Sequence, residues 1–179
     1  MAIDLVVPNV TFNTRRKIDE QPGHEFYDLT SSEIFADKRV VVFGLPGAFT
    51  PTCSSTHLPT FETYYDNICE LGIDEIYCVS INDCFVMNAW FSSLGIEKVK
   101  ALPDGNGAFT RPLGFLVDKT NFGMGMRSWR YSMLVENGEV VKVFEEPGKN
   151  NASDDDDPFT VSDADTMIRY LMGNPAESE

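Results

Sequence analysis

Short apolar runs alternate with stretches of helical periodicity along this chain, which is the pattern of an α/β protein. The runs Val40–Leu45 and Glu75–Ile81 are apolar enough to predict strands that are buried on both faces. Another strand is expected over Val10–Arg15. Two β-rich runs within Tyr131–Phe144 are joined at Glu136–Gly138, and this is the clearest hairpin signal in the sequence.

Three helices are predicted around these strands. The first covers Ser54–Leu71 and stops at a glycine. Asp83 can cap the second, which follows it directly. The last covers Val161–Met172 and is expected to be capped by Ser162 or Asp163. Periodicity alone therefore supports an α/β fold.

Two segments are predicted to lack regular structure. The stretch Ala101–Gly114 is rich in glycine and proline and is expected to be loop or turn. The acidic run Asp154–Asp157 offers carboxylates that suit calcium, but its spacing is not that of an EF-hand. We therefore expect a solvated loop there, and no metal or cofactor site.

Bulk composition limits the function. At 179 residues, the chain is expected to form one domain over residues 1–179. Its net charge of −14 argues against nucleic acid and anionic membranes as partners. We find neither the ~20 apolar residues of a membrane-spanning helix nor the pattern of a secretory signal. The four cysteines form no C-x-x-C pair, so free thiols in a reducing cytoplasm are expected.

One of these cysteines, Cys53, lies where the chain is expected to leave a strand and enter a helix. Backbone N–H groups in the first turn of a helix, or a nearby cation, favour the thiolate form of a cysteine. Pro51 suits the entry to a helix. Thr50 and Thr52 offer hydroxyls that can hydrogen-bond a thiolate or an oxygen-containing substrate, and Pro46 can shield the sulfur from water. This surrounding chemistry predicts a nucleophilic cysteine rather than a buried apolar filler.

The pattern Pro46-x-x-x-Thr50-x-x-Cys53 resembles the active-site signature of peroxiredoxins, the thiol peroxidases. The longer string "GLPGAFTPTCSSTHLP" resembles the peroxiredoxin-five subfamily, which includes the plant type-II enzymes. Val79–Trp90 and Gly125–Gly138 resemble further segments of that subfamily, in the same order. The resemblance covers roughly residues 3 to 172. It implies a thioredoxin-like fold, with a central mixed β-sheet flanked by helices.

The resemblance also implies roles for individual residues. Cys53 would be the peroxidatic cysteine that reduces hydrogen peroxide and alkyl hydroperoxides and becomes a sulfenic acid. Thr50 would hydrogen-bond the sulfur and the peroxide, and Pro46 would shield the pocket. Arg127 matches the family arginine that stabilises the thiolate. Arg130 is a rival, and if both arginines lie on one strand, only one of them can line the pocket.

The residues leave the reductant open. Late resolving cysteines occur in some members of the family, but the region Glu146–Thr160 has none. Cys78 matches the second cysteine of plant type-II members, yet it lies in an apolar strand where core packing is the simpler interpretation. The segment Asp157–Met167 resembles bacterial peroxiredoxin–glutaredoxin hybrids. We therefore expect a one-cysteine enzyme that is reduced by glutathione and glutaredoxin; a thioredoxin-dependent enzyme that uses Cys78 is the alternative.

Cys53 is also compatible with other functions. Cys53 and His57, four residues apart on one helix face, could form the nucleophile–base pair of a cysteine hydrolase. No third orienting residue is evident, which makes this function the least expected. A thiol-based redox sensor or chaperone would use the same cysteine. The subfamily resemblance also suggests a homodimer packed beside the active-site loops.

Overall fold

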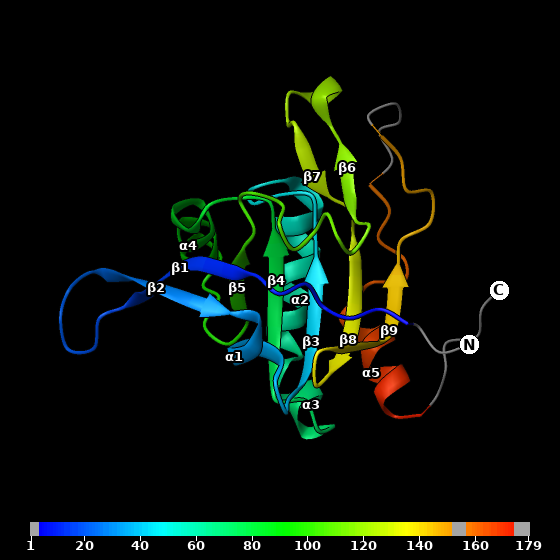
Figure 1. The fold of residues 1–179 in the computed structure, drawn as a ribbon, viewed down its shortest axis with the longest axis horizontal. Helices are drawn as coiled ribbons and strands as arrows, with labels where there is room; N and C mark the ends of the chain where they lie inside the picture. Colours follow the sequence, from blue (N-terminus) through cyan, green and yellow to red (C-terminus); the bar gives the residue numbers. More distant parts are fainter. Residues whose placement is uncertain (1–3, 152–156, 174–179) are drawn as a thin grey trace.

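The computed structural model describes residues 4–151 and 157–173, and a five-stranded sheet of order β5-β4-β3-β8-β9 forms its centre (Figure 1). Its strands in that order are β5 (Lys100–Pro103), β4 (Glu75–Ser80), β3 (Arg39–Gly44), β8 (Tyr131–Glu136) and β9 (Glu139–Glu145). Strands β3, β4 and β5 run parallel, whereas β8 is antiparallel to both β3 and β9. The expected mixed sheet is confirmed.

Each face of the sheet carries a different layer. One face is covered by α2 (Leu58–Thr63), α3 (Tyr65–Glu70), α4 (Cys84–Ser93) and α5 (Ala164–Leu171). The other is covered by the hairpin of β1 (Thr11–Lys17) and β2 (His24–Thr30), together with the short helix α1 (Ser31–Phe35).

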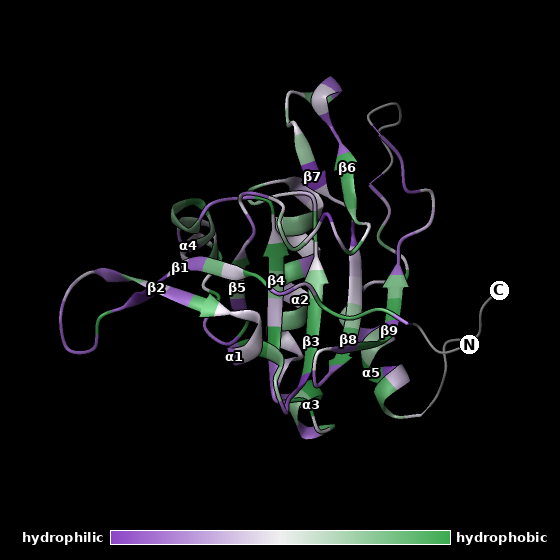
Figure 2. Cartoon of the chain, in the orientation of Figure 1, coloured by the Kyte–Doolittle hydropathy of each residue, from purple (hydrophilic) through white to green (hydrophobic). Residues whose placement is uncertain are grey.

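The central strand β3 contributes to both layers. Val41 and Phe43 belong to the cluster beneath the helices, and Val40 and Val42 belong to the opposite cluster. All four are fully buried, as the apolar run predicts. Figure 2 shows the hydrophobic colour concentrated on these central strands. Cys53 lies in the cluster on the helical face.

The turn and cap predictions hold in their main points. Asn137 (φ 47°) and Gly138 (φ 80°) both adopt the left-handed conformation of a type I′ hairpin between β8 and β9. Asp83 accepts a hydrogen bond from the backbone N–H of Val86 and caps α4. Asp163, rather than Ser162, caps α5.

Two sequence predictions need correction. The single helix expected over residues 54–71 is interrupted: a π-helical turn at Cys53–His57 precedes α2, and Tyr64 (φ −95°, ψ 10°) separates α2 from α3. The stretch Ala101–Gly114 is not all loop, because its first residues belong to β5. Pro103 lacks an N–H donor, but β5 is an edge strand and tolerates it.

The remaining elements were not predicted: β2, α1, β6 (Leu116–Asp118), the 3₁₀ turn η2 (Thr120–Phe122) and β7 (Met126–Ser128). Strand β2 is polar and largely exposed, so it lacks the apolar alternation on which the prediction depends. Among the helices in the described part of the chain, none has the length and apolar character needed to cross a membrane.

Candidate active site

Cys53 lies in the first turn of the helix that follows β3, and its side chain is fully buried. Pro51 and Thr52 already have helical conformation, so the chain enters the helix two residues before the cysteine. The backbone N–H of Leu58 donates to the carbonyl of Cys53, which closes a π-type turn. Such turns occur often at functional sites. Cys53 therefore lies at the start of a helix, as the sequence predicts.

The loop that leads into this helix is tightly constrained. Phe49 has φ +63°, a left-handed conformation that is uncommon for a bulky residue and costs energy. The backbone N–H of Ala48 donates to Asn82 Oδ1 at 3.0 Å, which ties the loop to the end of β4. Strain that surrounding contacts maintain is typical of functional loops.

Arg130 is the arginine beside the sulfur. Its Nη2 donates to Cys53 Sγ at 3.4 Å, and its side chain is fully buried just before β8. Burial opposes the positive charge, but the electrostatic interactions and hydrogen bonds with Cys53 and Asp157 together outweigh burial and raise the pKa of Arg130. The guanidinium therefore stays charged next to the cysteine.

Arg127 occupies a different position, so the expectation that it contacts the sulfur is corrected. It lies on β7, where Nε donates to the carbonyl of Met124 at 2.8 Å and Nη1 reaches the carbonyl of Pro46 at 3.5 Å. Gly47 allows this approach, since a Cβ there would lie 2.8 Å from Arg127 Nη1. Burial lowers the pKa of Arg127, while the charge of Cys53 acts in the opposite direction.

The reason for the correction lies in the backbone. The prediction assumed that both arginines could share one strand and so point to opposite faces. Strand β7 ends at Ser128 and β8 begins at Tyr131. The two arginines are thus separated by a break, and strand alternation does not decide which of them faces Cys53.

His57 orients Arg130. Arg130 Nη1 lies 2.9 Å from His57 Nδ1, and His57 Nε2 lies 3.1 Å from the carbonyl of Ser162. Because arginine can only donate, Nδ1 must accept, and the ring proton is then on Nε2. Burial first, and the charge of Arg130 second, hold the pKa of His57 well below its usual range. His57 is therefore a neutral residue with both nitrogens engaged, which disfavours the hydrolase pair.

Asp157 completes the set of Arg130 partners. Its Oδ1 accepts from Nη2 at 2.7 Å and from Nε at 3.2 Å. Asp157 is an exposed loop residue, as expected, with its side chain 41% exposed, but its carboxylate also pairs with the buried guanidinium, which was not predicted. The other acidic residues of that run, Asp154–Asp156, lie outside the described residues. Sequence patterns could not reveal this contact, because 27 residues separate the two partners.

A buried carboxylate, Glu146, organises the segment that carries these partners. It accepts hydrogen bonds from the backbone N–H groups of Thr160, Val161 and Ser162 at 2.8–2.9 Å. Burial would raise the pKa of Glu146, but these donors lower it. Its own backbone N–H donates to the carbonyl of Arg130 at 3.1 Å. Glu146 therefore links the Arg130 backbone to the segment that binds His57.

Thr50 and Pro46 lie at the half-buried side of the site. The hydroxyl of Thr50 donates to the carbonyl of Gly47 at 2.7 Å, so its hydrogen is engaged and its lone pairs are left to accept. The loop conformation thus makes Thr50 an acceptor, whereas the sequence expectation treated it as a general hydrogen-bond partner. The carbonyl of Pro46 accepts from Arg127 Nη1 at 3.5 Å.

Two of the other cysteines, Cys78 and Cys69, are poorly suited to redox chemistry with Cys53. All four are free thiols. Burial raises the pKa of Cys78 well above its usual range, and it also raises the pKa of Cys69. A thiol attacks through its thiolate form, so a raised pKa lowers its reactivity. Within residues 4–151 and 157–173, no group of His, Cys, Asp and Glu is arranged to hold a metal ion.

The chain that carries this buried cysteine and charged arginine is similar in sequence to known proteins. The Redoxin family model matches residues 7–168. A peroxiredoxin of Synechocystis is 53% identical over 175 residues, which cover 95% of this chain and 91% of that protein. This chain is a peroxiredoxin. It is accordingly a thiol-dependent peroxidase, as the resemblance of its cysteine motif implies.

The peroxiredoxin is also similar to other curated proteins and to solved structures. A hybrid peroxiredoxin of Haemophilus influenzae is 52% identical over 92% of this chain and 64% of its own length. Among solved structures, the 1-Cys peroxiredoxin antioxidant protein of Plasmodium falciparum matches with a TM-score of 0.89, at 36% identity, over 96% of this chain and all of that one. Reduced Prx3 of Vibrio vulnificus in complex with hydrogen peroxide matches with a TM-score of 0.80, at 37% identity, over 96% of each chain. The thioredoxin-like fold is confirmed.

Proposed function

We propose that this peroxiredoxin reduces hydrogen peroxide and alkyl hydroperoxides as a one-cysteine enzyme, with Cys53 as the reacting group and glutathione with glutaredoxin as the reductant. The observation that carries the proposal is the buried contact between Arg130 and Cys53 at 3.4 Å. A fixed cation favours the anionic sulfur and any negative charge on a peroxide oxygen beside it.

The first step is the attack of the Cys53 thiolate on one peroxide oxygen. A sulfur–oxygen bond forms, the oxygen–oxygen bond breaks, and the sulfur loses two electrons to become a sulfenic acid. The departing oxygen takes a proton and leaves as water or an alcohol. Arg130 stabilises the charge that develops between the two oxygens, and the lone pairs of Thr50 accept the hydrogen of the peroxide O–H.

The other residues of the site have supporting roles. Pro46 shields the sulfur side of the pocket. Arg127 adds positive potential at the half-buried rim rather than a direct contact, consistent with the electrostatic interaction between it and Cys53. His57 and Asp157 hold the guanidinium of Arg130 in the plane that reaches the sulfur.

The one-cysteine route rests on the properties of Cys78. Its burial and raised pKa make it a poor nucleophile toward a sulfenic acid on Cys53. Glutathione would instead condense with the sulfenic acid, which releases water and leaves a mixed disulfide. A glutaredoxin thiolate would then attack that disulfide and return Cys53 to its thiol form. A reducing cytoplasmic location agrees with four free thiols.

Peroxide turnover with two reductant systems tests this route. We expect turnover with glutathione plus glutaredoxin, and we expect it to be unchanged in Cys78→Ser. The Cys69→Ser variant is the matched control, because it removes a half-buried thiol away from the Cys53 cluster. Turnover supported by thioredoxin alone and lost in Cys78→Ser would establish the two-cysteine mechanism instead.

A homodimer beside the active-site loops is part of the same proposal. Phe49 and Met126 are 57% and 45% exposed, and they flank the loop and the strand that carry Thr50 and Arg127. Large apolar side chains exposed beside active-site residues favour a protein contact there. Sedimentation velocity should show a dimer that Phe49→Glu dissociates, whereas Phe26→Glu, at 70% exposure on the distant hairpin, should not. A monomeric wild-type chain would contradict this part of the proposal.

A further inference from the structure

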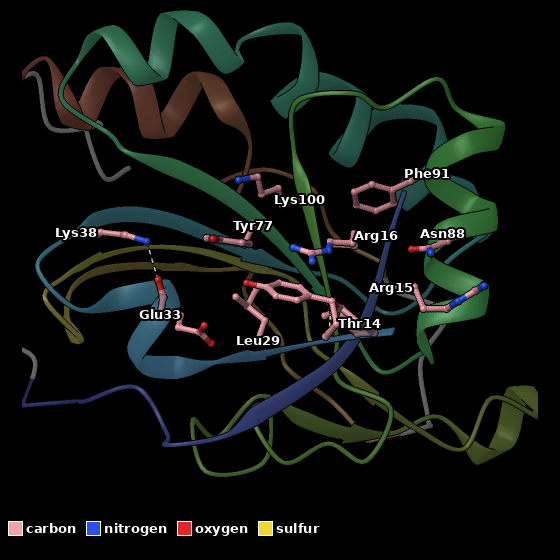
Figure 3. Close-up of a pocket in the computed structure, with 13 residues that line it drawn as sticks. Thr14, Arg15, Arg16, Leu29, Glu33, Lys38, Tyr77, Asn88, Phe91 and Lys100 are labelled. Carbon is pink, nitrogen blue, oxygen red and sulfur yellow. Dashed lines mark hydrogen bonds between the residues drawn. The ribbon is translucent and has the colours of Figure 1, made fainter. Parts of the chain in front are cut away.

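A cavity lies on the sheet face opposite Cys53. It has a volume of about 650 Å³ and lies between the hairpin β1–β2 and the strands β4 and β5, with α1 and α4 at its ends (Figure 3). Tyr77 of β4 lines it and belongs to the hydrophobic cluster on that face, whereas Cys53 belongs to the cluster beneath the helices. The peroxidase chemistry does not use this cavity.

Basic side chains are concentrated around the cavity. Arg15, Arg16, Lys38 and Lys100 line it together with one carboxylate, Glu33. These are four of the 14 lysines and arginines in a chain of net charge −14. This cluster of cations around the cavity therefore contrasts with the negative net charge of the whole protein. It creates a local positive potential that attracts anions.

These cations are only partly neutralised within the protein. Arg16 pairs with Glu25 at 2.7 Å, but both side chains are about half exposed, so water screens the pair. Lys38 donates to the backbone carbonyl of Glu33 at 2.6 Å, which is a neutral acceptor. Lys100 pairs with Glu75, and its side chain remains 59% exposed. An incoming anion can thus interact with Arg16 and Lys38 without first breaking a buried ion pair, whereas Lys100 is shared with Glu75, whose side chain is 12% exposed.

Two buried donors at the cavity have no acceptor among the described residues. Asn88 Nδ2 on α4 and Arg15 Nε on β1 are both buried without a hydrogen-bond partner. A donor left unpaired in this way costs about 1–3 kcal/mol, so such groups are normally satisfied by a partner. Both residues line the cavity, and Figure 3 shows Asn88 on the same side as Arg15. The Arg15 guanidinium lies over the ring of Phe85 at 4.8 Å, so Asn88 is the donor that a ligand with acceptor oxygens would satisfy.

The interior of the cavity is aromatic and apolar. The rings of Tyr27 and Tyr77 line it with Leu29 and Phe91, and Arg16 lies 4.5 Å from the centroid of the Tyr27 ring. Burial, with the charge of Glu75, raises the pKa of Tyr77 to about 12, so its phenol is neutral at physiological pH. In Figure 3, Arg16 lies between Tyr77 and Asn88, and Lys38 approaches from the opposite side. Flat apolar groups suit such a lining.

We propose that this cavity binds a small organic anion that has a flat aromatic body and a carboxylate head. The body packs between the hairpin and the sheet, against Tyr27 and Tyr77. The head accepts hydrogen bonds from Arg16 and Asn88, with Lys38 and Lys100 nearby. Inorganic anions lack the body, and neutral aromatic compounds lack the charge, so both should bind more weakly.

Titration of the ¹⁵N-labelled chain with 2-naphthoate, followed by NMR, tests the proposal. The side-chain amide signal of Asn88 and the backbone signal of Ala101 should shift in a saturable manner, with a Kd of about 1 mM or below. The backbone signals of Cys53 and Ser54 should not move. 2-Naphthamide, which has the same body without the charge, and inorganic phosphate, which has charge without a body, should each bind at least about tenfold more weakly.

Matched variants locate the interaction. Arg16→Gln should weaken 2-naphthoate about tenfold or more and leave the peroxidase rate unchanged, which also reports that the variant is folded. Lys142→Gln removes another cation beside aromatic rings, on β9, and should leave the affinity unchanged. Equal binding of the amide, an unaltered Kd in Arg16→Gln, competition of 2-naphthoate with peroxide at Cys53, or no shift at Asn88 would each overturn the proposal.

Discussion

Replacing Arg130 with lysine keeps the positive charge and removes the planar shape of the guanidinium, so it tests which of the two properties the site needs. The wild-type group donates to Cys53 Sγ at 3.4 Å, to His57 Nδ1 at 2.9 Å and to Asp157 Oδ1 at 2.7 Å. A lysine ammonium has one nitrogen and no planar fork, so it cannot reach all three acceptors from a single position. Because Asp157 carries a full charge at a short distance, we expect the ammonium to turn toward it.

The size of the effect follows from the contact that is lost. A hydrogen bond to a charged group contributes about 1.5–3 kcal/mol. If the bond from position 130 stabilises the transition state and is lost, kcat/KM for hydrogen peroxide should fall about ten- to a hundredfold. Arg127→Lys is the matched control, since Arg127 lies at the half-buried rim and donates to the carbonyls of Met124 and Pro46. We expect less than about a threefold change there, because lysine keeps the positive charge and the contacts that change are with Met124 and Pro46 rather than with Cys53.

Stopped-flow measurement of the rate of Cys53 oxidation gives kcat/KM directly, and thermal unfolding of each variant shows whether it remains folded. The assignment would be refuted if folded Arg130→Lys kept the wild-type rate, or if Arg127→Lys lost more activity than Arg130→Lys. The second result would restore Arg127 as the arginine that acts on the sulfur.

Three further predictions concern the neighbours of this contact. Thr50→Val, which keeps the shape and removes the acceptor, should lower kcat/KM about tenfold, whereas Thr50→Ser should stay near wild type. Asp157→Asn should keep at least about a third of the rate, while Asp157→Ala should lose about tenfold because Arg130 is no longer oriented. His57 stays neutral in the folded protein because its pKa is depressed, so the free energy of unfolding should fall below pH ~6.5, by up to about 1.4 kcal/mol per pH unit.

Each of these outcomes has a contrary result. Equal losses in Thr50→Val and Thr50→Ser would point to packing rather than the hydroxyl. Equal losses in both Asp157 variants would mean that its charge, not its placement of Arg130, matters. For His57, urea unfolding between pH 7.5 and 5.5 is compared with His57→Asn, in which this pH dependence should disappear; a flat wild-type profile would contradict the neutral assignment. The sign follows because only the unfolded state gains a proton in this range.

The sequence predicts the local part of the site and misses the distant part. Cys53 could be found because the residues that shape its helix start, Pro46 to Thr52, are its neighbours in the chain. The buried strands β3 and β4 could be found because continuous apolar runs are visible without any partner. Strand β5 could not, since its pairing with β4 stabilises a proline-containing segment whose local pattern indicates a loop.

The choice of arginine shows the same limit more sharply. Arg127 and Arg130 are both more than 70 residues from Cys53, and only the break between β7 and β8 determines which one reaches the sulfur. His57 and Asp157 depend on that same placement. Asp157 in particular belongs to an acidic run whose composition favours solvent, yet one carboxylate of the run contacts the buried guanidinium.

Mass spectrometry of the intact chain after one equivalent of hydrogen peroxide tests the central claim most directly. The account predicts a gain of one oxygen atom, located at Cys53 after the sulfenic acid is trapped, and no such gain in Cys53→Ser. A loss of two hydrogen atoms, which marks a disulfide, or oxidation at another cysteine while Cys53 stays reduced, would contradict it.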